Sequence, residues 1–196
     1  MESYPKFHNE VGVPIVRIGC REFKCIGDKP PQDHPHIFDL SYLGNLGSDR
    51  VITNVAVGAV KDGYRGVLAK CAMSVSLTTE TLYFPSGPAK ALHESFKRAN
   101  ADGRLPKISD QENDNFIATM PKIEDYDWNQ QNELSRIVLE VRAISFTDAM
   151  GFEFVMQDGA VRQFLIPTKV ARFFGEYVHQ YRQNFEDHKD STSDGH

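Results

Sequence analysis

The sequence lacks long apolar runs and has few cysteines. Among its 196 residues there is no stretch of roughly 18 consecutive apolar residues, so no transmembrane helix is predicted. Residues 1 to 10 hold three charged side chains and no apolar core, which argues against a secretory signal peptide. Three cysteines are too few for a disulfide scaffold and favour reduced thiols or metal ligands. We therefore expect a cytoplasmic protein with no membrane segment.

Patterns of the common catalytic sites are also missing. We find no Gly-rich phosphate loop, no Gly-x-Ser-x-Gly elbow, no His-Glu-x-x-His and no dinucleotide-binding pattern. Asp148, Glu153 and Asp158 lie near one expected hairpin, where acidic side chains are typical of a solvated turn. Cys71 lies within an apolar strand pattern, which indicates a buried thiol. We therefore predict that the chain is not an enzyme.

The balance of charge disfavours two further classes of partner. The net charge is −5, and polyanions such as nucleic acids and anionic membrane surfaces attract basic proteins. We expect neither nucleic acid nor membrane as a partner, although a local basic face is compatible with this composition. The hydrophobic share of 40% and the charged share of 25% are those of an ordinary globular protein.

The body of the chain, residues 49 to 185, predicts an α+β fold with antiparallel strands and two amphipathic helices. Its halves, about 51–100 and 134–183, each show alternating apolar residues that favour strands, followed by helical spacing. Gln157-Asp158-Gly159 is a strong hairpin signal, because Gly accepts a positive φ. Ser86 is the expected N-cap of the first helix.

The two halves match when the chain is shifted by 82 residues. Pro85 then falls on Pro167, Ser86 on Thr168, Ala89 on Ala171, Leu92 on Phe174 and Phe96 on Val178, and upstream Val55 and Val57 fall on Ile137 and Leu139 without a gap. The pattern predicts an internal duplication, in which each half is a β-meander followed by one helix. The alternative is chance, since a strand, a proline and a helix are a common succession.

The segment between the halves, residues 101–133, is polar and acidic. A structureless loop of this length is uncommon in a compact domain, so it either has local structure on the body or separates two units. Trp128 within it is either a partner anchor or a side chain that packs on the body. Residues 186–196 are polar and are expected to be a disordered tail.

The N-terminal segment, residues 1–48, carries a partial metal-site motif. Cys25 is followed after eight residues by His34-Pro35 and an apolar run. Over residues 11–38 this resembles the CHCC-type zinc-finger domain of the small zinc-binding accessory subunit of respiratory complex I. The family pattern closes with Cys-x-x-Cys, and here the next cysteine is the single Cys71. The resemblance therefore implies the first two zinc ligands, Cys25 and His34, and leaves the other two unmatched.

A substitute set of ligands lies in the same segment. Cys20, Cys25, His34 and His36 fall within 17 residues, and thiolates with imidazoles suit tetrahedral zinc. If residues 34 to 36 form a strand, both imidazoles point to the same side, because strand side chains alternate. The sequence thus predicts a zinc site here. One alternative is a remnant in which Cys20 and Cys25 are small packed hydrophobes. Another is a gene-level fusion or frameshift that replaced the second half of the finger with unrelated sequence.

These observations favour one function and leave two others open. The preferred one is a non-catalytic accessory or interaction protein, with a protein partner or self-association, that binds zinc through its N-terminal segment. The second is a small-ligand-binding protein or an enzyme with a site between the two repeats, which would need a concave pocket with converging polar groups. The third is a structural subunit whose strand edges pair between copies.

Overall fold

The structure, a computed structural model, describes residues 15–18, 21–24, 51–60, 66–73, 78–146 and 148–190. Within these ranges the chain forms two three-stranded antiparallel sheets, a separate two-stranded hairpin and four helices. The fold is therefore α+β, which confirms the sequence prediction. No helix in the described part of the chain is long and apolar enough to span a lipid bilayer.

The strands follow one another as three antiparallel groups. The hairpin is β1 (Ile15–Ile18) and β2 (Arg21–Lys24); sheet 1 is β3 (Ile52–Ala59), β4 (Gly66–Met73) and β5 (Thr79–Pro85); sheet 2 is β6 (Val138–Ser145), β7 (Ala149–Met156) and β8 (Val161–Pro167). The helices are α2 (Ser86–Ala101), α3 (Asp110–Thr119), α4 (Asp125–Asn129) and α5 (Thr168–Asp190). Sheet 1 with α2 is the first repeat, and sheet 2 with α5 is the second.

Each sheet passes into its helix at a proline. Strand β5 ends at Pro85 and β8 ends at Pro167, and the helix begins at the next residue. The prediction that Ser86 caps α2 is wrong, because Pro85 is at the N-cap position and no side chain accepts a cap hydrogen bond there. The start is set instead by proline, which lacks the N–H that would extend the strand ladder and has a φ of −55°.

The strand pairing supports the duplication and corrects its alignment. The shift of 82 residues relates β5 to β8 and the start of α2 to the start of α5. It does not hold at the first strand, because Met73 pairs with Ile52 whereas Met156 pairs with Val138. Ile52 therefore corresponds to Val138, four residues beyond the ungapped position. Val55 corresponds to Val141 and Val57 to Ala143, so their predicted matches to Ile137 and Leu139 are wrong.

The gap comes from the two hairpin turns of the first repeat. Strands β3 and β4 close on the pair Ala59–Val67, whereas β6 and β7 close on the nearer pair Ser145–Met150. The turn between β4 and β5 is also one residue longer than its counterpart between β7 and β8. Extra residues between two paired strands cost little stability, because the entropy of closing a loop rises slowly with its length.

A bulge recurs at the same place in both repeats. After the first pair of each sheet, the register shifts by one residue, which leaves Thr53 in β3 and Leu139 in β6 without a cross-strand partner. Both side chains are exposed. Because bulges re-aim a strand and sharpen its twist, a bulge at equivalent positions gives both sheets the same bend.

Two bridges join the sheets reciprocally. Val51, just before β3, forms a parallel bridge with Leu165 of β8, and Ile137, just before β6, forms one with Tyr83 of β5. Val51 is the counterpart of Ile137, and Tyr83 is the counterpart of Leu165. Each repeat therefore makes an equivalent bridge to the other repeat, as expected for two units related by a pseudo-twofold axis. Glu80 and its counterpart Arg162 form an ion pair with each other, which places both residues close to that axis.

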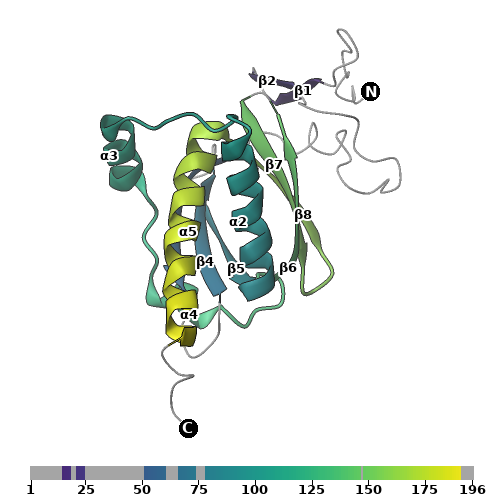
Figure 1. Cartoon of the computed structure of the whole chain (residues 1–196). Coiled ribbons are helices and arrows are strands. Elements are labelled where there is room, and N and C mark those ends of the chain that lie inside the picture. Colours follow the sequence, from purple (N-terminus) through teal and green to yellow (C-terminus); the bar gives the residue numbers. More distant parts are fainter. Residues whose placement is uncertain are drawn as a thin grey trace, which may run out of the picture.

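Helices α2 and α5 lie side by side and antiparallel across one face of the sheets (Figure 1). The antiparallel order follows from their contacts, since His93 meets His179 and Asn100 meets Arg172. Each helix contacts the first strand of the other repeat, α2 against β6 and α5 against β3. We call the helix-facing side of each sheet its inner face and the opposite side its outer face. The exchange of helices means that neither repeat covers its inner face alone.

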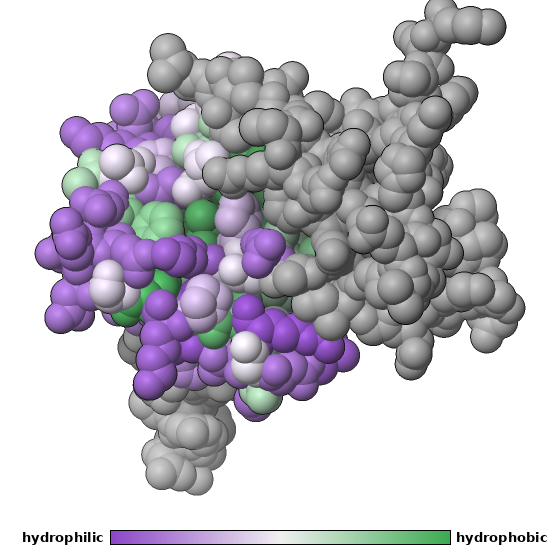
Figure 2. All heavy atoms as spheres, turned by 90° about the horizontal axis from the view of Figure 1, so that it is seen from above, coloured by the Kyte–Doolittle hydropathy of each residue, from purple (hydrophilic) through white to green (hydrophobic). Residues whose placement is uncertain are grey.

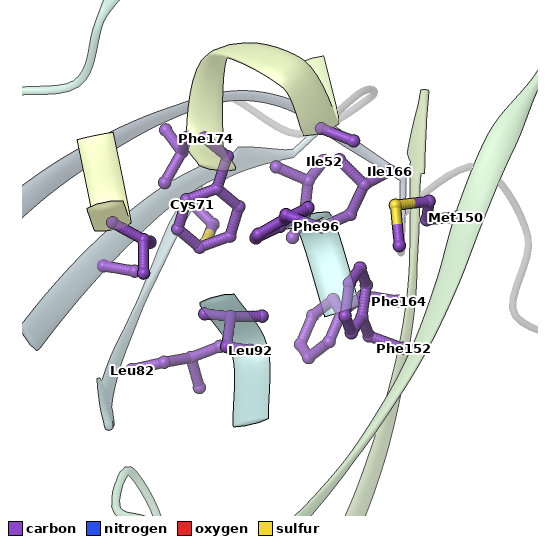
Figure 3. Packing of buried hydrophobic residues seen from close by; sticks show 14 of the residues in the cluster. Ile52, Cys71, Leu82, Leu92, Phe96, Met150, Phe152, Phe164, Ile166 and Phe174 are labelled. Atoms are coloured by element: carbon purple, nitrogen blue, oxygen red, sulfur yellow. The ribbon is translucent and has the colours of Figure 1, made fainter. Parts of the chain in front are cut away.

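The core fills the space between the inner faces and the helix pair. Phenylalanines from both repeats meet there, with Phe96 of α2 5.3 Å from Phe152 and 5.2 Å from Phe174 between ring centroids (Figure 3). Matched positions are buried in both repeats: Leu82 and Phe164, Phe84 and Ile166, Ala89 and Ala171, Leu92 and Phe174, and Phe96 and Val178. Each large side chain contributes roughly 1.5–3 kcal/mol by burial. The second amphipathic helix is confirmed, and its Tyr177 and Tyr181 are partly buried against the core.

The acidic segment between the repeats has local structure. We call residues 102–136, which join α2 to β6, the strap. Helix α3 begins with a capping box formed by Ser109 and Glu112, and Glu112 also forms an ion pair with Lys169 of α5. Phe116 packs against Phe173 with ring centroids 4.9 Å apart. Of the two readings of this segment, the one with local structure on the body is therefore confirmed, and α3 and α4 are additional to the two expected helices.

The strap continues across the outer face of sheet 1. Asn54 Nδ2 donates to the Phe116 carbonyl at 2.8 Å, which fixes the end of α3 at strand β3. An added Cβ at Gly58 would lie 3.0 Å from Trp128 Cη2, so the indole lies directly on the strand. Trp128 thus packs on the body. Helix α5 extends to Asp190, five residues into the predicted tail, and residues 191–196 lie outside the described ranges.

Candidate functional site

A groove of about 290 Å³ lies between α2 and α5. Its walls come from both repeat helices and the start of the strap: His93, Phe96, Lys97, Asn100, Leu105, Arg172, Gly175, Glu176 and His179. It therefore lies between the two repeats, where the sequence analysis placed the alternative ligand site. Its volume is at the lower end of the range for small-molecule pockets.

A glycine sets the depth of the groove. An added Cβ at Gly175 would lie 2.9 Å from Phe96 Cβ and 3.0 Å from Phe96 Cγ. Only a residue without a side chain allows the helices to approach this closely. Phe96 and Leu105 are almost fully buried and give the groove an apolar floor.

Two histidines bridge the helices at the groove. His179 Nδ1 and His93 Nε2 are 2.9 Å apart, the ring planes differ by 13° and the ring centroids are 4.9 Å apart. A separation of 2.9 Å is too short for stacked ring faces and fits an N–H···N hydrogen bond between ring edges. One imidazole therefore donates and the other accepts. His93 Nδ1 also lies 3.8 Å from Glu94 Oε1.

Basic side chains continue along the groove. Arg172 donates to Glu176 Oε1 at 2.6 Å and to Asn100 Oδ1, so its guanidinium is held across the two helices. Lys97 is exposed on α2 and also lines the groove. Lys97, Arg172 and the two imidazoles thus line the groove with one carboxylate, that of Glu176, which pairs with Arg172, while Glu94 lies beside His93. This local excess of basic groups contrasts with the net charge of −5 of the whole chain.

The surface near the helix ends is largely hydrophilic, with smaller hydrophobic areas between (Figure 2). A polar rim around apolar contacts is the usual composition of a protein-binding surface. Among the described residues that line the groove there is no serine, threonine or cysteine that would act as a nucleophile. The arrangement is suited to holding an anion beside an apolar group.

Cys71 lies in the core, away from the groove. It is fully buried among apolar side chains of both repeats (Figure 3). Burial raises the pKa of the Cys71 thiol to about 12. Because the thiolate is the reactive form, this thiol is inert at neutral pH. The interpretation of Cys71 as a buried thiol is confirmed.

The acidic residues near the last hairpin do not converge. Asp158 Oδ1 accepts from the Ala160 amide inside the turn, where Gly159 has a φ of 86°. Glu153 is buried in the middle of β7, where it accepts from Arg142 and Gln163 at 2.8 Å each. Asp158 is thus a turn residue, and Glu153 is part of a network within sheet 2.

The predicted zinc ligands Cys20, Cys25, His34 and His36 all lie outside the described residues. The zinc site therefore stays a prediction. Within the described part of the chain no group of three or more His, Cys, Asp or Glu side chains is placed to hold a metal ion.

Sequence analysis missed two polar clusters. No sequence pattern links His93 with His179, because the two side chains are 86 positions apart. The ion pair between Lys70 of β4 and Asp127 of the strap, with Nζ and Oδ2 2.8 Å apart, was also missed. A lysine on an otherwise apolar strand was the available signal, because such a charge needs a partner once buried.

Comparisons with known proteins give no relative on which to base a function. A scan against protein-family models finds no match for this chain, and searches of curated proteins and of solved structures find none either.

Proposed function

We propose that this chain is a non-catalytic interaction protein, and that the groove between α2 and α5 receives an acidic segment of a protein partner. The observation that supports it is the meeting of Lys97, Arg172 and the histidine pair over an apolar floor. A carboxylate would interact with the cations while an adjoining apolar side chain covers Phe96 and Leu105. Electrostatic complementarity of this kind gives specificity and speeds association.

The shape of the groove favours a protein segment over an enclosed small molecule. Small-molecule sites bury most of the ligand in cavities of roughly 300–1,000 Å³. This groove has a volume of about 290 Å³ and is bounded by exposed side chains such as Glu176 and His179. A partner that inserts one or two side chains would fill it and make further contacts along the helices.

The test uses an acidic pentapeptide with alternating glutamate and leucine, labelled with fluorescein, and the full-length protein. Fluorescence anisotropy gives Kd, and amide chemical shifts locate the site. We expect shift changes confined to α2, α5 and the start of the strap. The variant Lys97→Glu should weaken binding by about fivefold, because an exposed charge pair contributes roughly 0.2–1 kcal/mol and reversal turns attraction into repulsion.

Matched controls separate this proposal from its rivals. Lys122→Glu makes the same charge change on an exposed strap position away from the groove and should leave Kd unchanged. Equal binding of a peptide with lysine in place of glutamate would contradict the charge argument. Succinate that binds as tightly as the peptide would indicate a small-ligand protein instead. A concentration-dependent mass without peptide would point to self-association.

A further inference from the structure

The outer faces of the two sheets are related by the pseudo-twofold axis. The outer face of sheet 1 is covered by the strap. On sheet 1, Asp127 of the strap accepts from Lys70 Nζ at 2.8 Å and from Thr81 Oγ1 at 2.7 Å. Asp127 itself is only 3% exposed. Two side chains of the sheet therefore fasten the strap across its outer face.

The matching positions on sheet 2 are Glu153 for Lys70 and Gln163 for Thr81. Gln163 Nε2 donates to Glu153 Oε2 at 2.8 Å, which orients the amide because its oxygen would repel the carboxylate. Gln163 is 3% exposed, and its Oε1 has no hydrogen-bond partner among the described residues. A buried acceptor without a donor costs roughly 1–3 kcal/mol, so a segment that brings a donor to this face would stabilise it.

The chain itself arrives at this face. On sheet 1, the strap ends where the Tyr83 amide donates to the Arg136 carbonyl at 2.9 Å and Ile137 bridges Tyr83. On sheet 2, the counterpart of Ile137 is Val51, which bridges Leu165. Residues directly before Ile137 cross the outer face of sheet 1. Val51 therefore marks on sheet 2 the point that Ile137 marks on sheet 1.

We propose that the outer face of sheet 2 is a docking surface and that its occupant is the segment of this same chain that precedes Val51. That segment has 50 residues, of which the structure describes only strands β1 and β2, and the strap covers the equivalent face with 35. Its length is therefore sufficient. It supplies a donor to Gln163 Oε1, as the strap supplies an acceptor to Lys70 and Thr81. This proposal is independent of the groove between α2 and α5.

The face differs in charge from its counterpart, which specifies the occupant further. Sheet 1 presents Lys70 and receives an acidic strap, whereas sheet 2 presents Glu153 at the matching position and Glu140 nearby, both of them paired with Arg142. An occupant with N–H or cationic donors fits, and one with unpaired carboxylates does not. Residues 1–50 can supply such donors from six lysines and arginines, which are Lys6, Arg17, Arg21, Lys24, Lys29 and Arg50. The same segment holds seven aspartates and glutamates, so the fit depends on which of its side chains face the sheet and not on its net charge.

The test is site-specific photo-crosslinking in the full-length chain. A benzoyl-phenylalanine replaces Glu140, which is exposed and is the counterpart of Asn54, the residue that contacts the strap on sheet 1. The control places the same group at Tyr126 of α4, which is 66% exposed on the sheet 1 side. We expect irradiation at position 140 to join it to a peptide from residues 1–50 of the same molecule, and position 126 to give no such product.

Three results would overturn the proposal. A crosslinked dimer from position 140 would show that a second copy occupies the face. Reaction with solvent alone would show that the face is open. Equal crosslinking of residues 1–50 from position 126 would show that the segment has no preference for sheet 2. None of these results depends on peptide binding at the groove.

Discussion

The inner faces of sheet 1 and sheet 2 carry similar residues, whereas their outer faces carry different ones. Matched inner positions such as Leu82 and Phe164 are buried and apolar in both. Matched outer positions carry opposite charges, Lys70 in one sheet and Glu153 in the other. The inner faces meet the same helix pair and so face the same packing demand. The outer faces meet different segments, so the difference shows where each repeat has specialised.

The largest expected effect comes from loss of the strap's ion pair. Asp127→Ala leaves the Lys70 ammonium mostly buried without its partner and removes the acceptor of Thr81. Breaking a buried pair from one side costs about 3 kcal/mol. We expect the free energy of unfolding, measured by urea denaturation, to fall by that amount. Asp114→Ala, on an exposed position of α3, is the control and should change it by less than about 0.5 kcal/mol.

The counterpart substitution in sheet 2 sharpens the comparison. Glu153→Ala leaves Arg142 paired with Glu140 at 2.9 Å, and the Arg142 side chain is 29% exposed to water. We expect a smaller loss of about 1–2 kcal/mol, largely from the unpaired Gln163 amide. If both variants lost the same free energy of unfolding, the larger role of Asp127 could not be attributed to its holding the strap on sheet 1.

A second comparison concerns one position that is glycine in sheet 1 and alanine in sheet 2. Gly66 pairs with Pro85, and its counterpart Ala149 pairs with Pro167. An added Cβ at Gly66 would lie 2.2 Å from the Phe84 carbonyl oxygen, which is backbone and cannot turn away. Gly66→Ala should therefore destabilise the fold by about 2–3 kcal/mol, measured as a lower urea midpoint. Ala149→Gly should cost only about 1 kcal/mol, and the reverse ranking would contradict the close approach of the Phe84 carbonyl to Gly66.

The strap's ion pair also predicts the pH dependence of stability. Burial disfavours the charge on Asp127, but hydrogen bonds from the Glu124 amide, Lys70 and Thr81 hold the pKa of its carboxyl below its usual range. Because the folded pKa lies below the unfolded value of about 3.9, this group stabilises the fold above roughly pH 4. The contribution is lost as the pH falls through the folded pKa.

The measurement is the free energy of unfolding of wild type and Asp127→Asn between pH 7 and pH 2. Asparagine does not ionise, so the variant should be less stable at pH 7 and lose less stability below about pH 4. Parallel curves for the two proteins would show that another carboxylate governs the acid limb.

The smallest effect on the body is expected from the predicted N-terminal metal site. If Cys20, Cys25, His34 and His36 bind zinc, elemental analysis should find about one zinc per chain and none in Cys25→Ser. Neither the variant nor a chelator should move the unfolding midpoint of the described sheets by much, because no described residue belongs to that site. Absence of zinc from the wild type would leave residues 11–38 as a remnant.

Local patterns predicted most of the elements, since each depends on a few neighbouring residues. The prolines at 85 and 167 marked both strand-to-helix joins, and Gly159 marked the turn between β7 and β8. Where local signals compete, they mislead: Asp148 and Gly151 favour a turn, yet residues 149–151 are the start of β7. Ala149 is fully buried there, so burial between strands outweighs the turn preference of the adjacent residues.

The candidate site was beyond the reach of local patterns. The sequence predicted a groove between repeats as one alternative, but gave no sign that His93 would meet His179 or that Gly175 would bring the helices together. The antiparallel crossing of α2 and α5 pairs residues far apart in the chain. No periodicity within one helix contains that information.

The sequence by itself determined an α+β chain of two similar units, because apolar spacing and prolines act over short distances. Only the tertiary structure decided how the units join, with reciprocal bridges at Val51 and Ile137 and exchanged helices. It also decided that Asp127 covers sheet 1 through Lys70. Both features depend on the pairing of buried charges and on the exclusion of water from the sheet faces. Neither is determined until segments far apart in the sequence have come together.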